Sequence, residues 1–196
     1  FMADGNMLQN NRGAHFISFT ITDGKLLRSI KEVLQSDHKL SVRKRNTKWK
    51  TSYNLQIGSK RMFADLQKLG LTPRKSDRIK LPKVPRKYMS AFVRGYFDGD
   101  GHVCISTYRR RSRNNKKTKV ILSGFTSANK DFLIDLHQLL EAYAHMHGGS
   151  LFYNKGYRLT FSGANTLALY RFLYKDISAG LYLLRKKRIF EKYLRA

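Results

Sequence analysis

Two aspartates, each followed by a glycine, stand at matching places in the sequence and could hold a divalent cation. The first closes the run Phe1-Met2-Ala3-Asp4-Gly5, and the second closes Phe97-Asp98-Gly99-Asp100-Gly101. A lone Asp-Gly pair is usually a turn. Carboxylates are ligands that Mg²⁺ prefers, and water and phosphate oxygens can fill its remaining positions, which suits phosphodiester hydrolysis. Two copies therefore predict that Asp4 and Asp100 converge at a pseudo-two-fold axis.

A helix is expected directly before the second aspartate. After Pro85, the apolar residues of Met89–Phe97 recur at helical spacing, which predicts a helix from about 86 to 98. Carboxylates are unfavourable at the negative end of a helix dipole, so Asp98 and Asp100 need a compensating cation or hydrogen-bond donors. A metal ion is the natural compensator, while the glycines would let a neighbouring helix approach closely.

The chain reads as two similar halves. The helical pattern of Leu26–Leu34 matches that of Phe132–Leu140, and the alternating strand Tyr53–Ser59 matches Tyr157–Gly163. Each half predicts strand, strand, helix, strand, strand, helix, an α+β duplicate, with halves at 1–80 and 81–196. Helix caps are expected at Thr22 or Asp23 and at Ser127 or Asn129, turns at 45–47 and 154–156, and the join in the proline-interrupted stretch 73–85.

The composition is strongly basic, with 39 Lys plus Arg against 13 Asp plus Glu and a net charge of +26. Such self-repulsion favours a polyanionic partner, with a merely basic surface or a membrane-surface binder as the alternatives. The single cysteine, Cys104, excludes an internal disulfide and a zinc-finger class, and its place in a strand predicts a packing role. No secretory signal or long apolar span is evident, so an intracellular protein is expected, in cytoplasm, nucleoid or an organelle.

These features together resemble the LAGLIDADG homing endonuclease family in its single-chain, two-motif form. The second motif is nearly complete at Val93–Gly101, and Leu69–Ser76 with Val84-Pro85 precede it as in the family. The first motif keeps only its last five residues, with Met2 in place of its usual first aspartate. The sequence is therefore expected to be a fragment that lacks earlier helical turns.

The resemblance implies two saddle-shaped antiparallel sheets over a long double-stranded DNA site, with the motif helices at the centre of a monomer. An intron or intein is the expected origin, and a free-standing gene is the alternative. Asp4 and Asp100 would bind Mg²⁺, or Mn²⁺ or Ca²⁺, with the backbone carbonyls of Ala3 and Gly99. Water would then attack one phosphate on each strand across the minor groove. Lys75 and Lys186 would assist, with Arg185 or Lys187 as competitors of Lys186. No organic cofactor is expected.

The resemblance also implies that side chains on the sheets meet base edges in the major groove. A solvated loop is the alternative for the cationic run 109–117. The expected DNA-binding residues are Asn6, Gln9, Asn11, Arg12, Arg43, Lys44, Arg45, Lys48, Lys50, Tyr108, Arg109, Arg110, Arg111, Arg113, Lys116, Lys117, Lys119, Lys155 and Arg158.

Other functions on the same fold are an intron RNA maturase or a DNA-binding regulator that does not cut. A nonspecific basic scaffold is a third. A pure binder has no need for acidic residues facing phosphates, so the presence of both Asp4 and Asp100 favours the nuclease.

Overall fold

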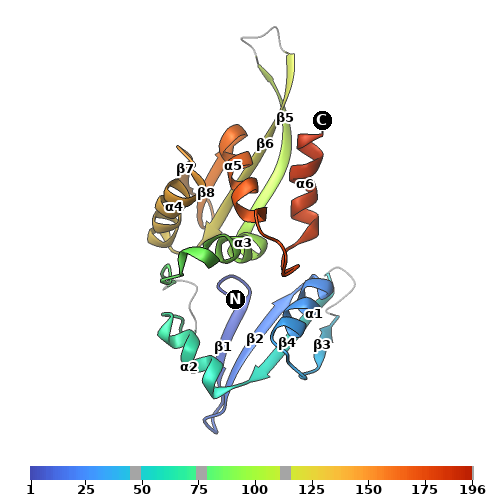
Figure 1. Cartoon of the computed structure of the whole chain (residues 1–196), viewed down its shortest axis with the longest axis vertical. Coiled ribbons are helices and arrows are strands. Elements are labelled where there is room, and N and C mark those ends of the chain that lie inside the picture. The colour runs from blue at the N-terminus through green and yellow to red at the C-terminus, as the bar shows by residue number, and fades with distance from the viewer. Residues whose placement is uncertain (45–49, 74–78, 111–115, 196) are drawn as a thin grey trace. The chain divides into compact units, whose positions relative to one another are not determined.

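The computed structural model describes residues 1–44, 50–73, 79–110 and 116–195, and the chain divides into two compact units. The first unit comprises Phe1–Val84 with Ile177–Leu183, and the second comprises Pro85–Asp176 with Leu184–Ala196. Each unit contains one four-stranded antiparallel sheet (Figure 1). No helix within the described ranges is long and apolar enough to cross a membrane.

The first unit follows the expected order of elements. They are β1 (Gly5–Gln9), β2 (His15–Ile21), α1 (Gly24–Val33), β3 (Leu40–Arg43), β4 (Ser52–Gly58) and α2 (Lys60–Lys68). The strands lie in the order β1-β2-β4-β3. Among the two candidates for the first cap, Asp23 caps α1, because its side chain accepts from the amides of Lys25 and Leu26.

The second unit repeats this order and adds a helix at each end. Its elements are η2 (Arg86–Tyr88), α3 (Met89–Asp100), β5 (Gly101–Arg110), β6 (Lys116–Ser127), α4 (Lys130–Ala144), β7 (Ser150–Tyr153), β8 (Tyr157–Ser162), α5 (Gly163–Tyr174) and α6 (Leu184–Leu194). The sheet order β5-β6-β8-β7 matches that of the first unit. The α+β duplicate is therefore confirmed.

The helix expected at 86–98 needs adjustment at both ends. The helix predicted from about 86 begins as a single 3₁₀ turn, and α3 proper runs to Asp100, two residues past the expected end. The cap of α4 is Asn129, which accepts from the amide of Phe132. The turn at 154–156 is present, with Lys155 and Gly156 at positive φ, while the turn at 45–47 lies outside the described residues.

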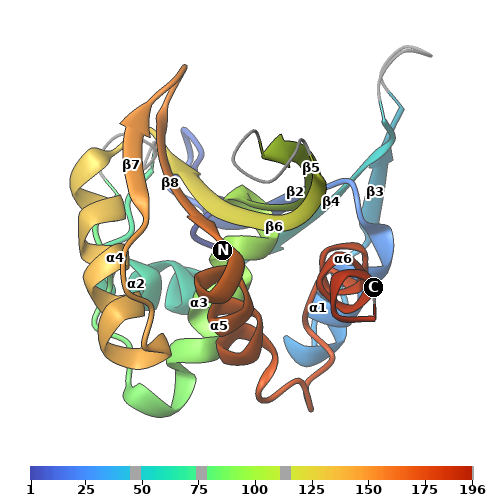
Figure 2. The ribbon, with the colours of Figure 1, turned by 90° about the horizontal axis from the view of Figure 1, so that it is seen from above.

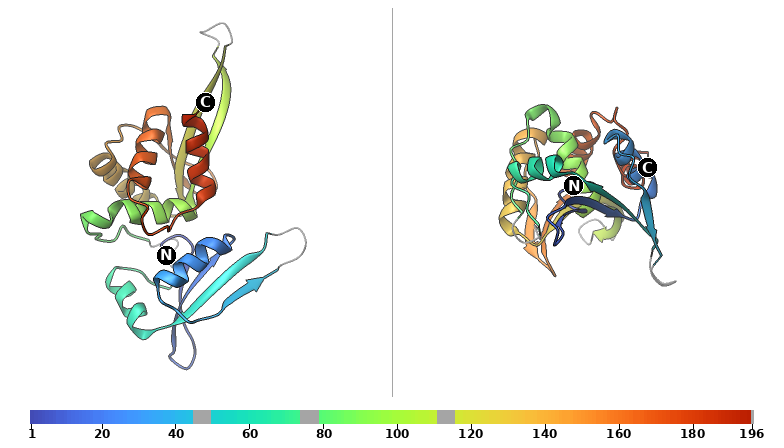
Figure 3. Two further views of the ribbon diagram at one scale, coloured as in Figure 1. Left: turned by 45° about the vertical axis from the view of Figure 1, so that its right-hand side comes forward. Right: turned by 90° about the horizontal axis from the view of Figure 1, so that it is seen from below.

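Strand alternation sorts each sheet into a buried face and an open face. In the second unit, Val103, Ile121, Phe125, Leu159 and Phe161 are buried on one face, where α3, α4 and α5 pack (Figure 2). In the first unit, Met7, Ile17, Leu55 and Ile57 form the buried face, and α1 and α2 pack beside them (Figure 3). Alternate residues lie on the opposite, open face of each sheet.

The cap of α4 predicts a stability change. Replacing Asn129 with alanine leaves the amide of Phe132 without its side-chain acceptor, which is expected to lower the free energy of unfolding by about 1 kcal/mol. Urea unfolding followed by circular dichroism measures this. Lys130→Ala, at the exposed neighbouring position, serves as the control and should be near neutral. Equal stability of the Asn129→Ala protein and the parent would contradict the assignment.

Candidate functional site

Asp4 and Asp100 occupy equivalent places in their units. Asp4 lies directly before β1, and Asp100 is the last residue of α3, directly before β5; both are exposed. After each aspartate a glycine amide bonds back to the carbonyl four residues earlier. Gly5 donates to Phe1 O at 2.8 Å, and Gly101 donates to Phe97 O. Each carboxylate therefore stands where a helical turn passes into the first strand of a sheet.

The two glycines are needed for close packing against a phenylalanine. A Cβ on Gly5 would lie 2.5 Å from Phe1 O and collide with the Phe1 ring, and a Cβ on Gly101 would meet Phe97 in the same way, 2.5 Å from its carbonyl oxygen. Each glycine also has a phenylalanine as its partner on the neighbouring strand. Gly5 pairs with Phe19, and Gly101 pairs with Phe125.

Ring contacts complete this repeated turn. Phe1 meets Phe19 edge to face with centroids 5.3 Å apart, and Phe97 meets Phe125 in the same manner at 5.5 Å. The next strand is also in the same register, because Phe19 pairs with Leu55 and Phe125 pairs with Leu159. The two Phe-x-x-Asp-Gly segments thus have the same local structure, each within its own unit.

Lys186 lies at the end of α3, where the negative helix terminus and two aspartates come together. Its ammonium donates to Phe97 O at 2.5 Å, to Asp98 O at 2.8 Å and to Gly101 O at 2.6 Å, and the residue is 4% exposed. Cations are favourable at this end of a helix. The sequence suggested a metal ion as the compensator of the helix end, and the structure places a lysine there.

The donors beside each aspartate fit a hard cation only in part. The described residues include no cluster of three or more His, Cys, Asp or Glu side chains that could hold a metal. Each unit instead offers one exposed carboxylate, on Asp4 or Asp100, flanked by backbone carbonyls. The three carbonyls bound by Lys186 do not include that of Gly99. Such a donor set suits Mg²⁺ or Ca²⁺ if water and phosphate oxygens supply the other ligands.

Two titratable side chains near Asp100 have shifted pKa values. Burial, and then the negative charge of Asp100, raise the pKa of Tyr96 well above its usual value, and its hydroxyl donates to Thr126 O at 2.9 Å. Burial lowers the pKa of His102, and the positive charges of Arg158 and Lys186 lower it further. At neutral pH, His102 therefore presents an uncharged imidazole beside the site.

Two neighbouring rows on the open face of the first sheet are polar. Asn6, Ser18 and Gln56 pair across three strands, and Thr20, Asn54 and Ser41 form the next row. Asn54 donates to the hydroxyl of Thr20 at 2.8 Å, which fixes its amide within this row. Arg43 lies on the same face in the following row, where it pairs with Ser52, and is exposed.

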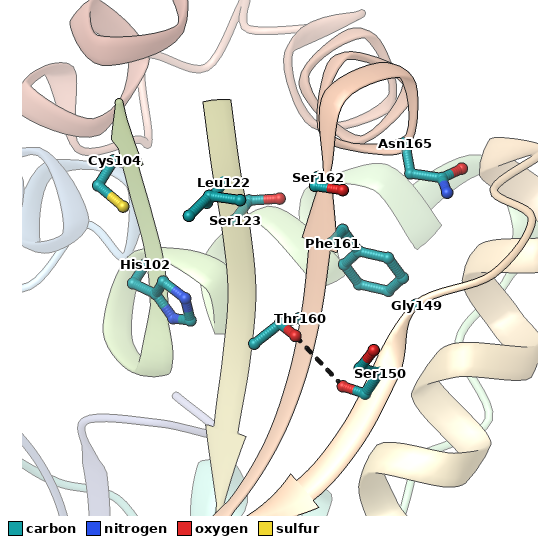
Figure 4. A pocket seen from close by; sticks show the side chains of 10 residues that line it. All are labelled: His102, Cys104, Leu122, Ser123, Gly149, Ser150, Thr160, Phe161, Ser162 and Asn165. Atoms are coloured by element: carbon teal, nitrogen blue, oxygen red, sulfur yellow. Dashed lines mark hydrogen bonds between the residues drawn. The ribbon is translucent and has the colours of Figure 1, made fainter. Parts of the chain in front are cut away.

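The open face of the second sheet carries a hollow of about 340 Å³. His102 and Cys104 of β5 and Thr160 of β8 line it, and Ser150 closes one side, where its carbonyl accepts from the Thr160 hydroxyl (Figure 4). The His102 ring lies over Gly124, since a Cβ there would be 2.7 Å from its Cε1. Cys104 is exposed on this face, so its expected packing role is wrong.

The expected DNA-binding residues are distributed unevenly over these faces. Four of them lie on the open faces: Asn6, Arg43, Tyr108 and Arg158. By strand alternation, four others belong to the opposite face: Gln9, Arg109, Lys117 and Lys119. The exposed residues Asn11, Arg12, Lys44, Lys50 and Lys155 lie in the connections between strands. Arg110 and Lys116 lie in β5 and β6. The remaining residues lie outside the described ranges: Arg45, Lys48, Lys75, Arg111 and Arg113.

Several polar residues of the open faces were not among those expected. They include Gln56 and Thr20 in the first unit and His102 and Thr160 in the second. Their signal is present in the sequence. Polar residues alternate with apolar ones in Asn54-Leu55-Gln56-Ile57, as expected for a strand with one covered face.

Part of the chain matches a family model. Residues 87–170 match the model of the LAGLIDADG-like domain. The matched range includes α3 with Asp100 and most of the second unit. The resemblance seen in the motif is therefore confirmed for this part of the sequence.

Two curated proteins share sequence with the chain. The probable translation initiation factor IF-2 of Thermococcus kodakarensis is 34% identical over 130 residues, which are 62% of this chain and 10% of that protein. The replication factor C small subunit of Methanocaldococcus jannaschii is 30% identical over 106 residues, 53% of this chain and 6% of that protein. The chain thus spans a small fraction of either relative.

Solved structures match nearly the whole chain. The LAGLIDADG meganuclease I-AabMI, bound to uncleaved DNA, has a TM-score of 0.65 at 12% identity, covering 99% of this chain and 86% of that one. I-SmaMI, bound to an uncleaved DNA target in the presence of calcium ions, has a TM-score of 0.59 at 13% identity, covering 99% and 86%. At this identity the likeness shows the fold, which is that of LAGLIDADG meganucleases.

The repeated turn predicts matched effects of two substitutions. Gly5→Ala and Gly101→Ala each place a methyl group against a phenylalanine ring and carbonyl, and each is expected to lower the free energy of unfolding by about 1 to 3 kcal/mol. Thermal or urea unfolding measures the change. Gly58→Ala is the control, because its Cβ would lie at an ordinary 3.5 Å from Phe16. An effect at only one of the two positions would show that the turns are not equivalent.

Proposed function

We propose that this chain, which has the fold of the LAGLIDADG meganucleases, is a site-specific double-stranded DNA endonuclease that hydrolyses one phosphodiester bond on each strand with divalent metal. The observation that carries the proposal is the repeated Phe-x-x-Asp-Gly turn. Each unit presents one such exposed carboxylate, Asp4 or Asp100, directly before the first strand of its sheet. Helices cover one face of that sheet. A structural duplicate without chemistry would not require an acid at both places.

The net charge of +26 supports DNA as the partner. A protein surface of this charge attracts the phosphate backbone at long range, and contacts to phosphates supply most of the affinity that does not depend on sequence. The positive charge also counteracts the repulsion that the two aspartates exert on phosphates. The carboxylates would therefore be tolerated at a DNA surface only with cations between them and the backbone.

Asp4 and Asp100, with the carbonyls of Ala3 and Gly99, would hold the metal ions. Mg²⁺ is the natural choice for such oxygen donors, with Mn²⁺ or Ca²⁺ as substitutes. When bound, the metal supplies Lewis-acid polarisation of the phosphate and lowers the pKa of a bound water molecule. The role of the chain is to hold the carboxylates in place and to orient the scissile phosphates.

Basic residues near each carboxylate would stabilise the charge that develops on the phosphate. In the second unit, Lys186 is buried and donates to the carbonyls of Asp98 and Gly101, so Arg185, exposed next to it, is the proposed phosphate contact. Lys187 forms an ion pair with Glu191 on its own helix, so its ammonium is engaged there. Lys75 is proposed for the corresponding role in the first unit.

The open sheet faces would read the DNA sequence. The amides of Asn6 and Gln56 suit adenine and the guanidinium groups of Arg43 and Arg158 suit guanine or phosphate. Arg158 is half-buried on this face, and its Nε is buried without a hydrogen-bond partner among the described residues. The neutral imidazole of His102 can both donate and accept in the same hollow.

The two curated relatives support a mobile origin. A translation initiation factor and a replication factor subunit have different names, yet each shares a stretch with this chain that is 10% or less of its length. A module that occurs in such different proteins is best explained by insertion into their genes. We therefore assign the chain to an intein or intron and take the uninterrupted host gene as its target. The protein would act as a monomer, with one unit in the place of each subunit of a dimer.

Replacing either carboxylate is expected to separate cutting from binding. Asp4→Asn and Asp100→Asn should each lower double-strand cleavage of a plasmid carrying the uninterrupted host gene by about 100-fold or more, because a lost metal ligand removes several kcal/mol of transition-state stabilisation. Binding in Ca²⁺ should persist. The assay separates supercoiled, nicked and linear plasmid.

Asp135→Asn is the control for these variants, because it changes an exposed carboxylate on α4 to the same amide. If the parent protein binds the plasmid tightly but never cuts it, the endonuclease proposal fails. Tighter binding to intron RNA than to duplex DNA at matched salt would then point to a maturase.

The open faces predict which arginines contribute to affinity. Arg43→Ala and Arg158→Ala, made in the Asp100→Asn protein, should each weaken target binding by about 1 to 3 kcal/mol or reduce the salt slope by about one charge. Arg28→Ala on α1 and Arg171→Ala on α5 are the matched controls, as exposed arginines on helices. Equal losses in all four variants would indicate a diffuse charge effect and exclude the open faces as the reading surface.

A further inference from the structure

Lys186 makes three hydrogen bonds to one short stretch of backbone. An ammonium group has three donors, and those of Lys186 point to Phe97 O, Asp98 O and Gly101 O at 2.5 to 2.8 Å. Burying a lysine is costly unless each donor is satisfied, and here each is. The side chain is therefore fixed by the end of α3.

The three acceptors bracket the residues that matter for metal binding. Phe97 and Asp98 belong to the last turn of α3, while Gly101 is the first residue of β5. Gly99 and Asp100 lie between them. Because the ammonium joins both sides of this pair, it fixes the backbone from which the Asp100 carboxylate and the Gly99 carbonyl extend.

Aromatic contacts hold the lysine in position. Its ammonium lies 5.0 Å from the centroid of the Phe97 ring, and Phe190, one helical turn further along α6, contacts the same ring at 6.0 Å between centroids. Phe190 is fully buried and also stacks on Tyr170 of α5. The helix that carries Lys186 is thus packed into the second unit, and the lysine cannot leave the α3 end without disturbing it.

We propose that Lys186 is a positioning residue for Asp100, and that it acts by clamping the backbone on both sides of the Gly99-Asp100 pair rather than by exchanging a proton with substrate or water. The inference rests on the proposed function of Asp100. The clamp also supplies positive charge at the negative end of α3, where two aspartates lie.

The first test needs neither metal nor DNA. Amide hydrogen exchange at Gly101, whose N–H bonds to Phe97 O, is compared in the parent, Lys186→Met, Lys186→Arg and Lys187→Met proteins. Loss of the clamp should speed exchange at Gly101 by about 10-fold or more in Lys186→Met. Lys187→Met should leave it unchanged, because that lysine bonds to Glu191. Lys186→Arg should recover part of the protection, since a guanidinium also donates to several carbonyls.

The second test uses cleavage as a function of Mg²⁺ under single-turnover conditions. Lys186→Met should need about 10-fold more Mg²⁺ for half-maximal rate, because Asp100 is no longer held in place. Lys186→Arg should stay active with an unchanged pH profile. An arginine cannot give up its proton, so a proton-transfer role would make this variant inactive.

Two outcomes would overturn the clamp. One is Lys186→Met with parental exchange at Gly101, and the other is an inactive Lys186→Arg whose exchange is parental. Should Lys186→Met fail to fold, Lys186→Arg carries the test in both assays. If the parent itself does not cleave DNA, the exchange measurement still decides whether the clamp exists, so failure of the proposed function is distinguishable from failure of the clamp.

Discussion

The constraint on which the second unit depends is the placement of two aspartates at the negative end of a helix. Without a nearby cation, Asp98 and Asp100 would repel the terminal carbonyls of α3 and shorten the helix. The ammonium of Lys186 removes this conflict by binding three carbonyls at once. As a result α3 extends to Asp100, and β5 starts at the very next residue.

The repeated Phe-x-x-Asp-Gly turn places one exposed carboxylate in each unit. A phenylalanine packed against a glycine four residues later forces the chain to turn sharply, and the strand partner of that glycine supplies the ring that covers it. The aspartate that precedes the glycine is exposed in both units. The packing that builds each sheet therefore also exposes one carboxylate, and both units follow the same rule.

Each sheet separates packing from recognition. Alternate residues face the helices and form the core, which leaves the remaining residues free to be amides, hydroxyls and guanidinium groups. The open face can thus change its side chains at small cost to the fold. This separation is consistent with solved structures at 12% to 13% identity that keep the same fold.

The sequence by itself determined the order of elements, the duplication and the two candidate carboxylates, because helix caps, alternation and Asp-Gly turns depend on neighbouring residues. Only the tertiary structure decided what depends on contacts between distant segments. Lys186 meets Phe97 across 89 positions, and nothing local to either residue predicts the contact. The tertiary structure also decided which strand residues face outward, because helices pack on only one face of each sheet. Arg109 and Arg158 are both cationic strand residues, yet only Arg158 shares the open face with His102 and Thr160.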